Sequence, residues 1–242
     1  MALILCIETA TEVCSVALAR DEKLLGLKES SVRNGHSALL TTFIDELVRS
    51  ASVVLNDLDA IAVSMGPGSY TGLRIGVATA KGLCFAIDKP LIAVPTLQAM
   101  ASGINFKFQI SNFKFESQNP NTKILICPMI DARRMEVYCA VYDLNYNELR
   151  DVRADIIDEF SFQEFLSETV VVFGGEGSDK CKPTLGNHPN ALFLDGFQAS
   201  AKYMTTLAEK KFHQKQFEDL AYFEPFYLKD FVAGKPRVKG LI

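Results

Sequence analysis

Apolar residues in the first hundred positions form short runs that are separated by polar turns. Three runs have the length of strands and follow one another closely, at residues 2–9, 13–19 and 23–31. Residues 36–51 instead repeat apolar side chains at spacings of three and four, which predicts an amphipathic helix. The series continues with a strand at 58–64, a glycine-rich turn and helix at 66–87, a strand at 91–94 and a helix at 96–102.

A similar order of elements recurs in the second half of the chain. Strands are predicted at 124–130, 136–142, 149–157, 170–173 and 191–194, and helices at 160–168 and 200–214. The halves also share a local pattern: an apolar strand ends near an acid, a polar turn follows, and the chain resumes with Glu-Val, at Glu12 and at Glu136. Together these features predict two related α/β domains.

The predicted N-terminal domain covers residues 1–103 and the C-terminal domain covers residues 124–228. Between them, residues 104–123 contain Asn105-Phe-Lys-Phe and Asn112-Phe-Lys-Phe, an alternation typical of an edge hairpin or a variable insertion. Residues 229–242 form a basic tail, which we interpret as solvated. A contact of this tail with nucleic acid or with an acidic partner is the alternative. The charged residues of the tail are Lys229, Lys235, Arg237 and Lys239 against Asp230.

Composition restricts the class of protein. With 242 residues and 48% hydrophobic content, the chain can bury the cores of two domains. The formal net charge of −4 argues against broad attraction of the whole chain to nucleic acid or to anionic membranes. The apolar start has no cationic flank and meets Glu8 too early for a signal peptide, and no apolar run reaches membrane-spanning length. A cytoplasmic protein is therefore expected, with its six cysteines as buried free thiols.

The glycine-rich stretch from Ser64 to Leu83, SMGPGSYTGLRIGVATAKGL, resembles a phosphate-binding loop that runs into a helix. It matches no nucleotide fingerprint, because Leu73 and Arg74 follow Gly72 where a P-loop has Lys-Ser or Lys-Thr. Its glycines also give GxGxxxG, whereas the dinucleotide pattern is GxGxxG.

A strip of small residues along one side of this helix suggests another role. Gly68, Gly72, Gly76 and Ala80 recur every four residues. Each glycine inside a helix costs about 1 kcal/mol relative to alanine, so the strip calls for a compensating close contact. That neighbour is either in the same domain or in another chain. We favour another chain, because the apolar side chains of the helix at 36–51 cover about half of its circumference, more than one sheet contact requires.

Three further motifs have both a functional and a structural interpretation. Glu8 and Thr9 enter a tight hairpin of the kind that holds metal and phosphate in actin-like kinases, although a solvated hairpin tip is equally expected. Asp131-Ala-Arg-Arg134 occupies the equivalent position in the second half, where we interpret the charges as an exposed or interdomain ion pair. Gly174 and Gly175 form a turn that approaches adenosine in the actin-like architecture, or simply a tight strand-to-helix turn.

The histidines offer no metal site in the sequence. His36, His188 and His213 are far apart, without an HxxxH or HExxH pair. We interpret His36, with Ser37, as a cap at the N-terminus of the helix at 36–51. No Ser/His/Asp or Cys/His nucleophile arrangement is visible either, so the chain is expected to be poor in chemistry.

These motifs closely resemble the TsaB (YeaZ-type) family of the actin-like ATPase superfamily, over residues 3 to about 228. The most specific match is GPGSYTGLRIGVATAKG at 66–82. Supporting matches are Ile7-Glu-Thr-Ala, Gly35-His-Ser, Asp131-Ala-Arg with Glu136-Val-Tyr, and Pro225-Phe-Tyr-Leu. The chain departs from the family in having Glu8 where Asp is usual, and in the insertion at 104–122. The resemblance implies two tandem actin-like, ribonuclease H-like domains, each a mixed sheet flanked by helices.

The resemblance also implies a function. TsaB proteins are partners of the threonylcarbamoyl transferase TsaD and, with the ATPase TsaE, support formation of N6-threonylcarbamoyladenosine at position 37 of tRNA. TsaD has the HxxxH metal pair that this chain lacks. The chain is therefore expected to be a non-catalytic scaffold, a homodimer when alone, with tRNA contacted indirectly and no membrane contact. The alternatives are a glycoprotease-like metallopeptidase and an ATP-binding small-molecule kinase.

In this family the partner is bound through two N-domain helices, here 36–51 and 69–86. The residues expected at the interface are Leu39, Leu40, Phe43, Leu47, Gly68, Tyr70, Thr71, Gly72, Arg74, Ile75, Gly76, Thr79 and Ala80. The positions expected to mark a vestigial nucleotide site are Glu8, Thr9, Gly174 and Gly175. No catalytic residue, metal or cofactor is expected.

Overall fold

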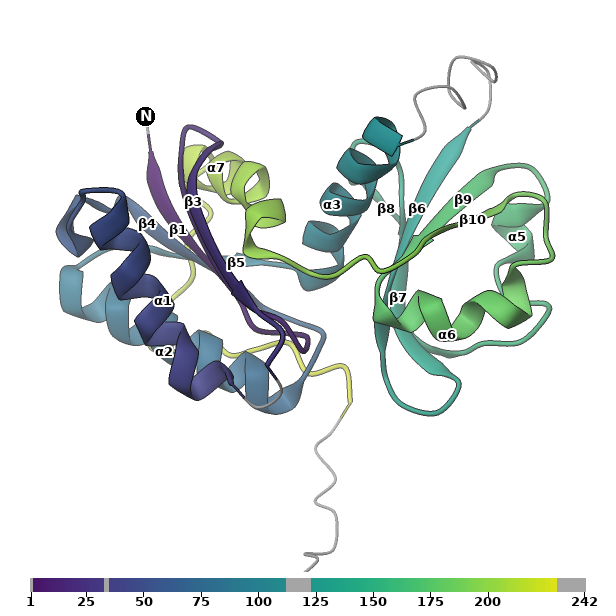
Figure 1. Ribbon diagram of the computed structural model, residues 1–242, viewed down its shortest axis with the longest axis horizontal. Coiled ribbons are helices and arrows are strands. Elements are labelled where there is room, and N and C mark those ends of the chain that lie inside the picture. The colour runs from purple at the N-terminus through teal and green to yellow at the C-terminus, as the bar shows by residue number, and fades with distance from the viewer. Residues whose placement is uncertain (1, 33–34, 112–122, 230–242) are drawn as a thin grey trace, which may run out of the picture.

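The computed structural model describes residues 2–32, 35–111 and 123–229. Two five-stranded sheets, one built from each half of the chain, form two domains that lie side by side (Figure 1). Each sheet has helices on both faces, which confirms the predicted α/β class and the two related domains.

The first sheet has the order β3-β2-β1-β4-β5. Its strands are β1 (Leu3–Glu8), β2 (Cys14–Arg20), β3 (Lys23–Ser30), β4 (Ala60–Ser64) and β5 (Leu91–Val94). Strands β1, β2 and β3 are antiparallel neighbours, whereas β1, β4 and β5 run parallel. Strand β1 is central and buried along its whole length, which explains why its sequence is continuously apolar rather than alternating.

Helices α1 (His36–Ser50) and α2 (Tyr70–Ile87) cover one face of this sheet, α1 over β2 and β3 and α2 over β4. Successive side chains of β1 point to opposite faces of the sheet. Leu5 and Ile7 face α1 and α2, and Ile4 and Cys6 face the other side. A short 3-10 helix, η1 (Leu55–Asp57), connects α1 to β4.

The second sheet has the order β10-β9-β6-β7-β8, which matches the first when read from β8. Its strands are β6 (Ile124–Asp131), β7 (Glu136–Tyr142), β8 (Glu148–Ile156), β9 (Val170–Gly174) and β10 (Ala191–Leu194). One face packs on α3 (Thr96–Ser111), and the other on α5 (Gln163–Leu166) and α6 (Glu176–Leu185). We did not predict α6, because Cys181 and Leu185 are its only buried apolar residues and Pro183 lies inside it.

The structure corrects the predicted insertion at 104–123. Residues 104–111 continue α3, and Ile104 and Phe108 are buried in the core of the second domain. The buried positions Leu97, Met100, Ala101, Ile104 and Phe108 follow a helical spacing, whereas the Asn-Phe-Lys-Phe pattern over only four residues suggested a strand. The second Asn-Phe-Lys-Phe motif, at 112–115, lies outside the described residues.

The end of the predicted C-terminal domain, residues 201–228, belongs spatially to the first domain. The 3-10 helix η2 (Ala201–Met204) and helix α7 (Thr205–His213) pack on the face of the first sheet that α1 and α2 leave uncovered. Figure 1 shows α7 beside β1, and α3 beside β6. The chain therefore crosses between the domains twice, once before α3 and once before η2.

The segment after α7 continues along the first domain. The N–H of Glu218 donates to the carbonyl of Leu91 at 2.9 Å, and Phe223 is buried in the core under α2. The N–H of Phe226 then donates to the carbonyl of Met65 at 2.7 Å. At the end of the described chain, Lys229 forms an ion pair with Glu136 of the second domain.

Candidate functional site

Glu8 lies at the end of β1, where the first domain meets the second. Its side chain is only 1% exposed, and its Oε1 accepts a hydrogen bond from the N–H of Ala10 at 2.6 Å. Burial raises the pKa of Glu8 to about 7, even though hydrogen bonds from Ala10 and Ser64 favour the ionised form. The charge of Glu176, from the second domain, raises this pKa further.

Glu176 is the first residue of α6 and directly follows the Gly174-Gly175 turn. Gly175 has a φ of +110°, and a Cβ at this position would collide with the carbonyl oxygen of Met129, so glycine is required here. Burial raises the pKa of Glu176 to about 7, and the charges of Asp131 and Glu12 add to this effect. The turn at 174–175 and Glu8 thus approach each other from opposite domains.

Two carboxyl groups that titrate near neutral pH can each take up or release a proton at this junction. In residues 2–32, 35–111 and 123–229, no group of three or more His, Cys, Asp or Glu side chains could hold a metal ion. Glu8, Thr9, Gly174 and Gly175 stay the predicted positions of a vestigial nucleotide site.

His36 does not cap its own helix, so that interpretation is wrong. The N-cap of α1 is Gly35, and no side chain caps this end. Instead, Nε2 of His36 lies 3.1 Å from the carbonyl oxygen of Thr11 and ties α1 to the turn between β1 and β2. His188 and His213 contact Asn190 and Glu209, in two other regions.

The glycine strip of α2 packs inside the subunit, which corrects the prediction that another chain covers it. A Cβ on Gly68 would collide with Ala10, and a Cβ on Gly72 or Gly76 would come closer than 3.0 Å to Thr9. The three glycines therefore allow α2 to lie against the turn that follows Glu8. The neighbour is a loop of the same chain, and sequence spacing alone did not reveal which element approaches.

Burial sorts the remaining residues of the predicted interface. Leu40, Leu47, Gly72, Gly76 and Ala80 are buried in the first domain, so a partner cannot reach them in the folded subunit, and their assignment to the interface is wrong. Thr71 and Arg74 are exposed. Half-buried residues make up the rest of the set: Leu39, Phe43, Gly68, Tyr70, Ile75 and Thr79.

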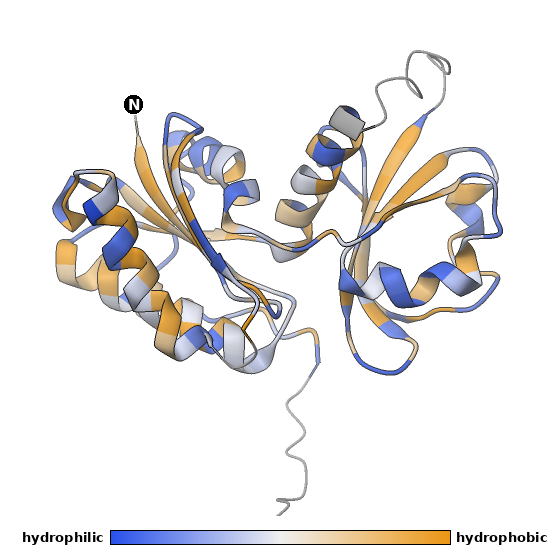
Figure 2. Ribbon diagram, in the orientation of Figure 1, coloured by the Kyte–Doolittle hydropathy of each residue, from blue (hydrophilic) through white to orange (hydrophobic). Residues whose placement is uncertain are grey.

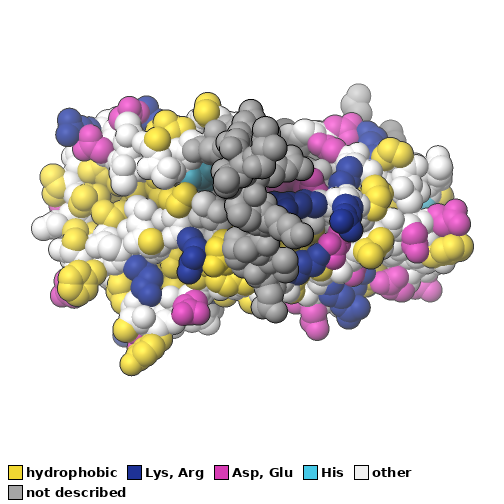
Figure 3. All heavy atoms as spheres, turned by 90° about the horizontal axis from the view of Figure 1, so that it is seen from below, with side chains coloured by type: hydrophobic (Ala, Val, Ile, Leu, Met, Phe, Trp, Pro, Cys, Tyr) yellow, Lys and Arg dark blue, Asp and Glu magenta, His cyan; other side chains and the backbone are white. Residues whose placement is uncertain are grey.

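The outward side of α2 is almost free of charge. Six residues of this helix are exposed, and only Arg74 among them is charged; the other five are Thr71, Ala78, Gly82, Phe85 and Ala86. Phe85 is 86% exposed, and a Cβ on Gly82 would meet no atom within 4 Å. Figure 2 shows α2 mainly in orange and white, and Figure 3 shows a largely uncharged underside of the first domain. We did not predict Ala78, Gly82 and Phe85, although a helical projection from the buried Val77 places them outward.

The hairpin between β6 and β7 forms a partly exposed ion pair, in agreement with the exposed ion pair that we expected there. Asp131 pairs with Lys180 of α6, whose Nζ also donates to the carbonyls of Arg134 and Glu136, at 2.7 Å each. Arg133 and Arg134 are exposed, and their guanidinium groups have no ion pair among the described residues.

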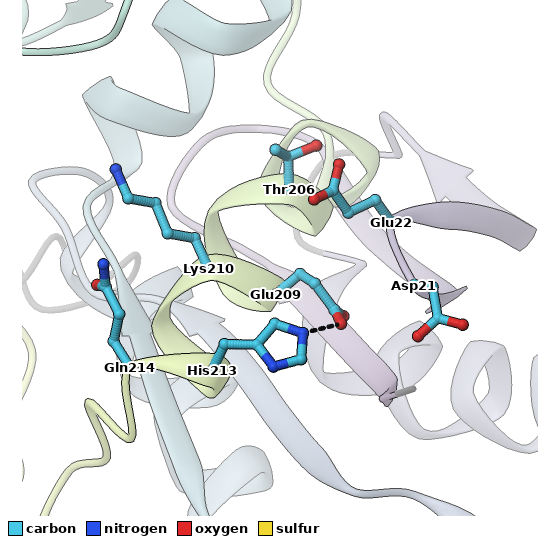
Figure 4. Close-up of a pocket in the computed structure, with 7 residues that line it drawn as sticks. All are labelled: Asp21, Glu22, Thr206, Glu209, Lys210, His213 and Gln214. Atoms are coloured by element: carbon cyan, nitrogen blue, oxygen red, sulfur yellow. Dashed lines mark hydrogen bonds and ion pairs between the residues drawn. The ribbon is translucent and has the colours of Figure 1, made fainter.

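Two cavities lie away from Glu8. The larger, of about 520 Å³, lies between α7 and the turn between β2 and β3 (Figure 4). Its lining mixes Asp21, Glu22 and Glu209 with Lys210 and His213, so it offers no single charge to a ligand. The smaller, of about 210 Å³, lies at the domain junction and is lined by polar residues that include Glu29, Lys107 and Lys202.

The two sheets have the same strand topology, and the first strand of each ends in an acid. These features define a two-domain protein of the actin-like fold. A solved structure described as YeaZ from Pseudomonas aeruginosa matches with a TM-score of 0.77 and 24% identity, over 94% of this chain and 100% of that one. Among the described residues, no helix is long and apolar enough to cross a membrane.

Sequence comparison gives the family. A family model described as TsaD, tRNA N6-adenosine threonylcarbamoyltransferase, matches residues 22–235. The tRNA threonylcarbamoyladenosine biosynthesis protein TsaB of Escherichia coli is 32% identical over 241 residues, 96% of each chain. A tRNA N6-adenosine threonylcarbamoyltransferase of Staphylococcus saprophyticus is 40% identical over 108 residues, 38% of this chain and 32% of that protein. The chain belongs to the TsaB family of tRNA threonylcarbamoyladenosine biosynthesis proteins.

Proposed function

We propose that this chain is a non-catalytic subunit required for the synthesis of N6-threonylcarbamoyladenosine in tRNA, and that it binds a TsaD-type transferase. Membership of the TsaB family supports the pathway. The similarity of one part of the chain to a transferase of that pathway supports a related partner, because related domains often associate through equivalent surfaces.

The uncharged outer side of α2 is the observation that favours a binding role. An exposed helix of a monomer normally presents charged side chains to water, whereas Phe85, Ala78 and Gly82 present apolar or small ones. Small residues also allow a partner helix to approach closely. The proposed contact therefore uses the exposed side of α2, where Thr71 and Arg74 of the predicted set lie, with the half-buried Ile75 and Thr79 at its edge.

Further partners follow from the same proposal. A TsaE-type ATPase would join through the complex, and tRNA would be held for modification by the transferase. In the absence of the transferase, the same surface of α2 would join two copies of this chain. The assembly would act in the cytoplasm, where tRNA is modified. No observation favours the peptidase or the kinase alternative.

Reconstitution tests the proposal. Purified transferase, TsaE-type ATPase, the adenylate-forming enzyme and tRNA are incubated with and without this chain, and modified adenosine is measured by mass spectrometry. We expect product only when the chain is present. Equal product in its absence would exclude a required role, and product from this chain without the transferase would exclude a non-catalytic one.

A charge on the outer side of α2 should disrupt the complex without unfolding the subunit. We expect Ala78→Glu to weaken binding to the transferase about tenfold or more, because the interface would bury an unpaired carboxylate. Thermal unfolding of the isolated subunit should be nearly unchanged, since Ala78 is exposed. Asn187→Glu, at an exposed position of the second domain, is the matched control and should bind normally. Normal binding by both variants would place the interface elsewhere.

A further inference from the structure

The hairpin between β6 and β7 presents two adjacent arginines at its tip. Arg133 and Arg134 are both exposed, and neither side chain has a hydrogen bond or ion pair to any described residue. The backbone of the hairpin is nevertheless fixed by hydrogen bonds. The N–H of Arg133 donates to Asp131 at 2.8 Å, and the N–H of Ala132 donates to the carbonyl of Glu136 at 3.1 Å.

The two acids of the hairpin are neutralised by lysines from other parts of the fold. Lys180 of α6 pairs with Asp131, and Lys229 of the C-terminal segment pairs with Glu136. The two arginines are left as uncompensated positive charge at the tip. The charges of Asp131 and Asp179 act on Glu176 of α6, so acidic groups lie near the Asp131 end of the hairpin.

Backbone conformation shows that these arginines occupy positions better suited to other residues. Arg133 has a φ of 71° and Arg134 a φ of 51°, in the left-handed region that glycine and asparagine adopt most readily. Two consecutive arginines in this conformation do not improve the turn. Their presence is better explained by what the side chains contact outside the subunit.

We propose that the tip formed by Arg133 and Arg134 contacts the phosphate backbone of the tRNA on which the assembly acts. This inference rests on the proposed function, because that function brings tRNA to the complex. The planar guanidinium group matches phosphate oxygens in a two-pronged geometry. This contact between the chain and tRNA is direct and adds to the binding of tRNA by the transferase. It positions the phosphate backbone of the tRNA without recognising the base sequence.

The distribution of charge favours RNA over an acidic protein as the partner. Beyond Lys229, the sequence adds Lys235, Arg237 and Lys239 against Asp230 alone. Lys229, the last residue that the structure describes, is bound to Glu136 of the hairpin. Repeated positive charge suits an extended polyanion, whose attraction sums over many phosphates. Figure 3 shows a group of Lys and Arg side chains on the underside of the second domain.

The test separates charge from turn stability. The double variant Arg133→Asn with Arg134→Gly removes both charges and places favoured residues in the left-handed positions. Its thermal unfolding midpoint should be equal to or higher than that of the unaltered protein. Binding of a labelled, unmodified tRNA transcript is measured by fluorescence anisotropy across a salt series, for this chain alone and mixed with the transferase. We expect roughly tenfold weaker binding at moderate salt, and a salt slope lower by about 2.

Two controls accompany the double variant. Arg133→Lys with Arg134→Lys keeps the charge and should retain most of the salt slope. Arg20→Gln with Lys23→Gln removes two exposed charges from the far end of the first domain and should leave tRNA binding unchanged.

Three outcomes would decide against the proposal. Unchanged tRNA affinity and slope in the Asn-Gly variant would overturn it, as would the absence of any tRNA binding by this chain and its mixture with the transferase. If the variant lost binding to the transferase while its tRNA affinity and salt slope stayed unchanged, the tip would instead contact an acidic protein surface. If reconstitution shows the chain to be dispensable for modification, weaker tRNA binding by the variant still supports the contact, so the two failures are distinguishable.

Discussion

Replacing Gly72 by alanine is expected to destabilise the subunit by about 3 kcal/mol. The new Cβ would overlap the carbonyl oxygen of Thr9, and a backbone atom cannot move aside without disturbing the turn that follows Glu8. Gly76→Ala should also destabilise, but less than Gly72→Ala. Its Cβ collides with the hydroxyl of Thr9, and a side-chain atom can move aside more easily than a backbone atom. Urea unfolding of the purified variants measures both effects.

A double-mutant cycle tests the assignment of these contacts. Thr9→Ala removes the hydroxyl that obstructs Gly76→Ala, and this buried oxygen has no hydrogen-bond partner to lose. The two substitutions should therefore be less destabilising together than their sum, with a coupling of about 1 kcal/mol. Thr9→Ala should not rescue Gly72→Ala. Gly82→Ala is the control on the same helix and should stabilise by about 1 kcal/mol, because its Cβ meets nothing. Equal effects at 72, 76 and 82 would contradict the packing described here.

The unfolding free energy should depend on pH through Glu8. Its pKa of about 7 in the folded protein exceeds the ordinary value of 4.5, so the folded state binds the proton more tightly than the unfolded state. The contribution of Glu8 to stability is therefore fully present below pH 4.5 and is lost as the pH rises through about 7. The upper limit of this loss is on the order of 3 kcal/mol. Glu176, which titrates in the same range, adds a change of the same sign.

Glu8→Gln isolates this effect, because the amide oxygen can still accept the hydrogen bond from Ala10 while the group stays neutral. The variant should match the unaltered protein near pH 4 and exceed it in stability near pH 8, as measured by urea unfolding at each pH. Glu159→Gln, at an exposed position, is the control and should show no such crossover. A constant difference between Glu8→Gln and the unaltered protein across this range would show that Glu8 does not titrate there.

Most elements were predictable from the sequence because their apolar periodicity spans several turns or a whole strand. The errors occurred where the pattern was short or weak. Residues 105–108 alternate like a strand but continue α3, and α6 has too few apolar residues to be recognised. Glu8 and the turn at 174–175 were found from local motifs, whereas Glu176 was missed, since only the approach of the two domains gives it a charged neighbour across the junction.

The sequence by itself determined the repeated α/β architecture and the family, since periodicity and motifs are properties of neighbouring residues. It also determined that α2 contains a strip of glycines. Only the tertiary structure decided what that strip touches, because a missing Cβ permits a close approach without specifying which element makes it. For the same reason, the free arginines of the hairpin between β6 and β7 became visible only when Lys180 and Lys229 were seen to neutralise its acids.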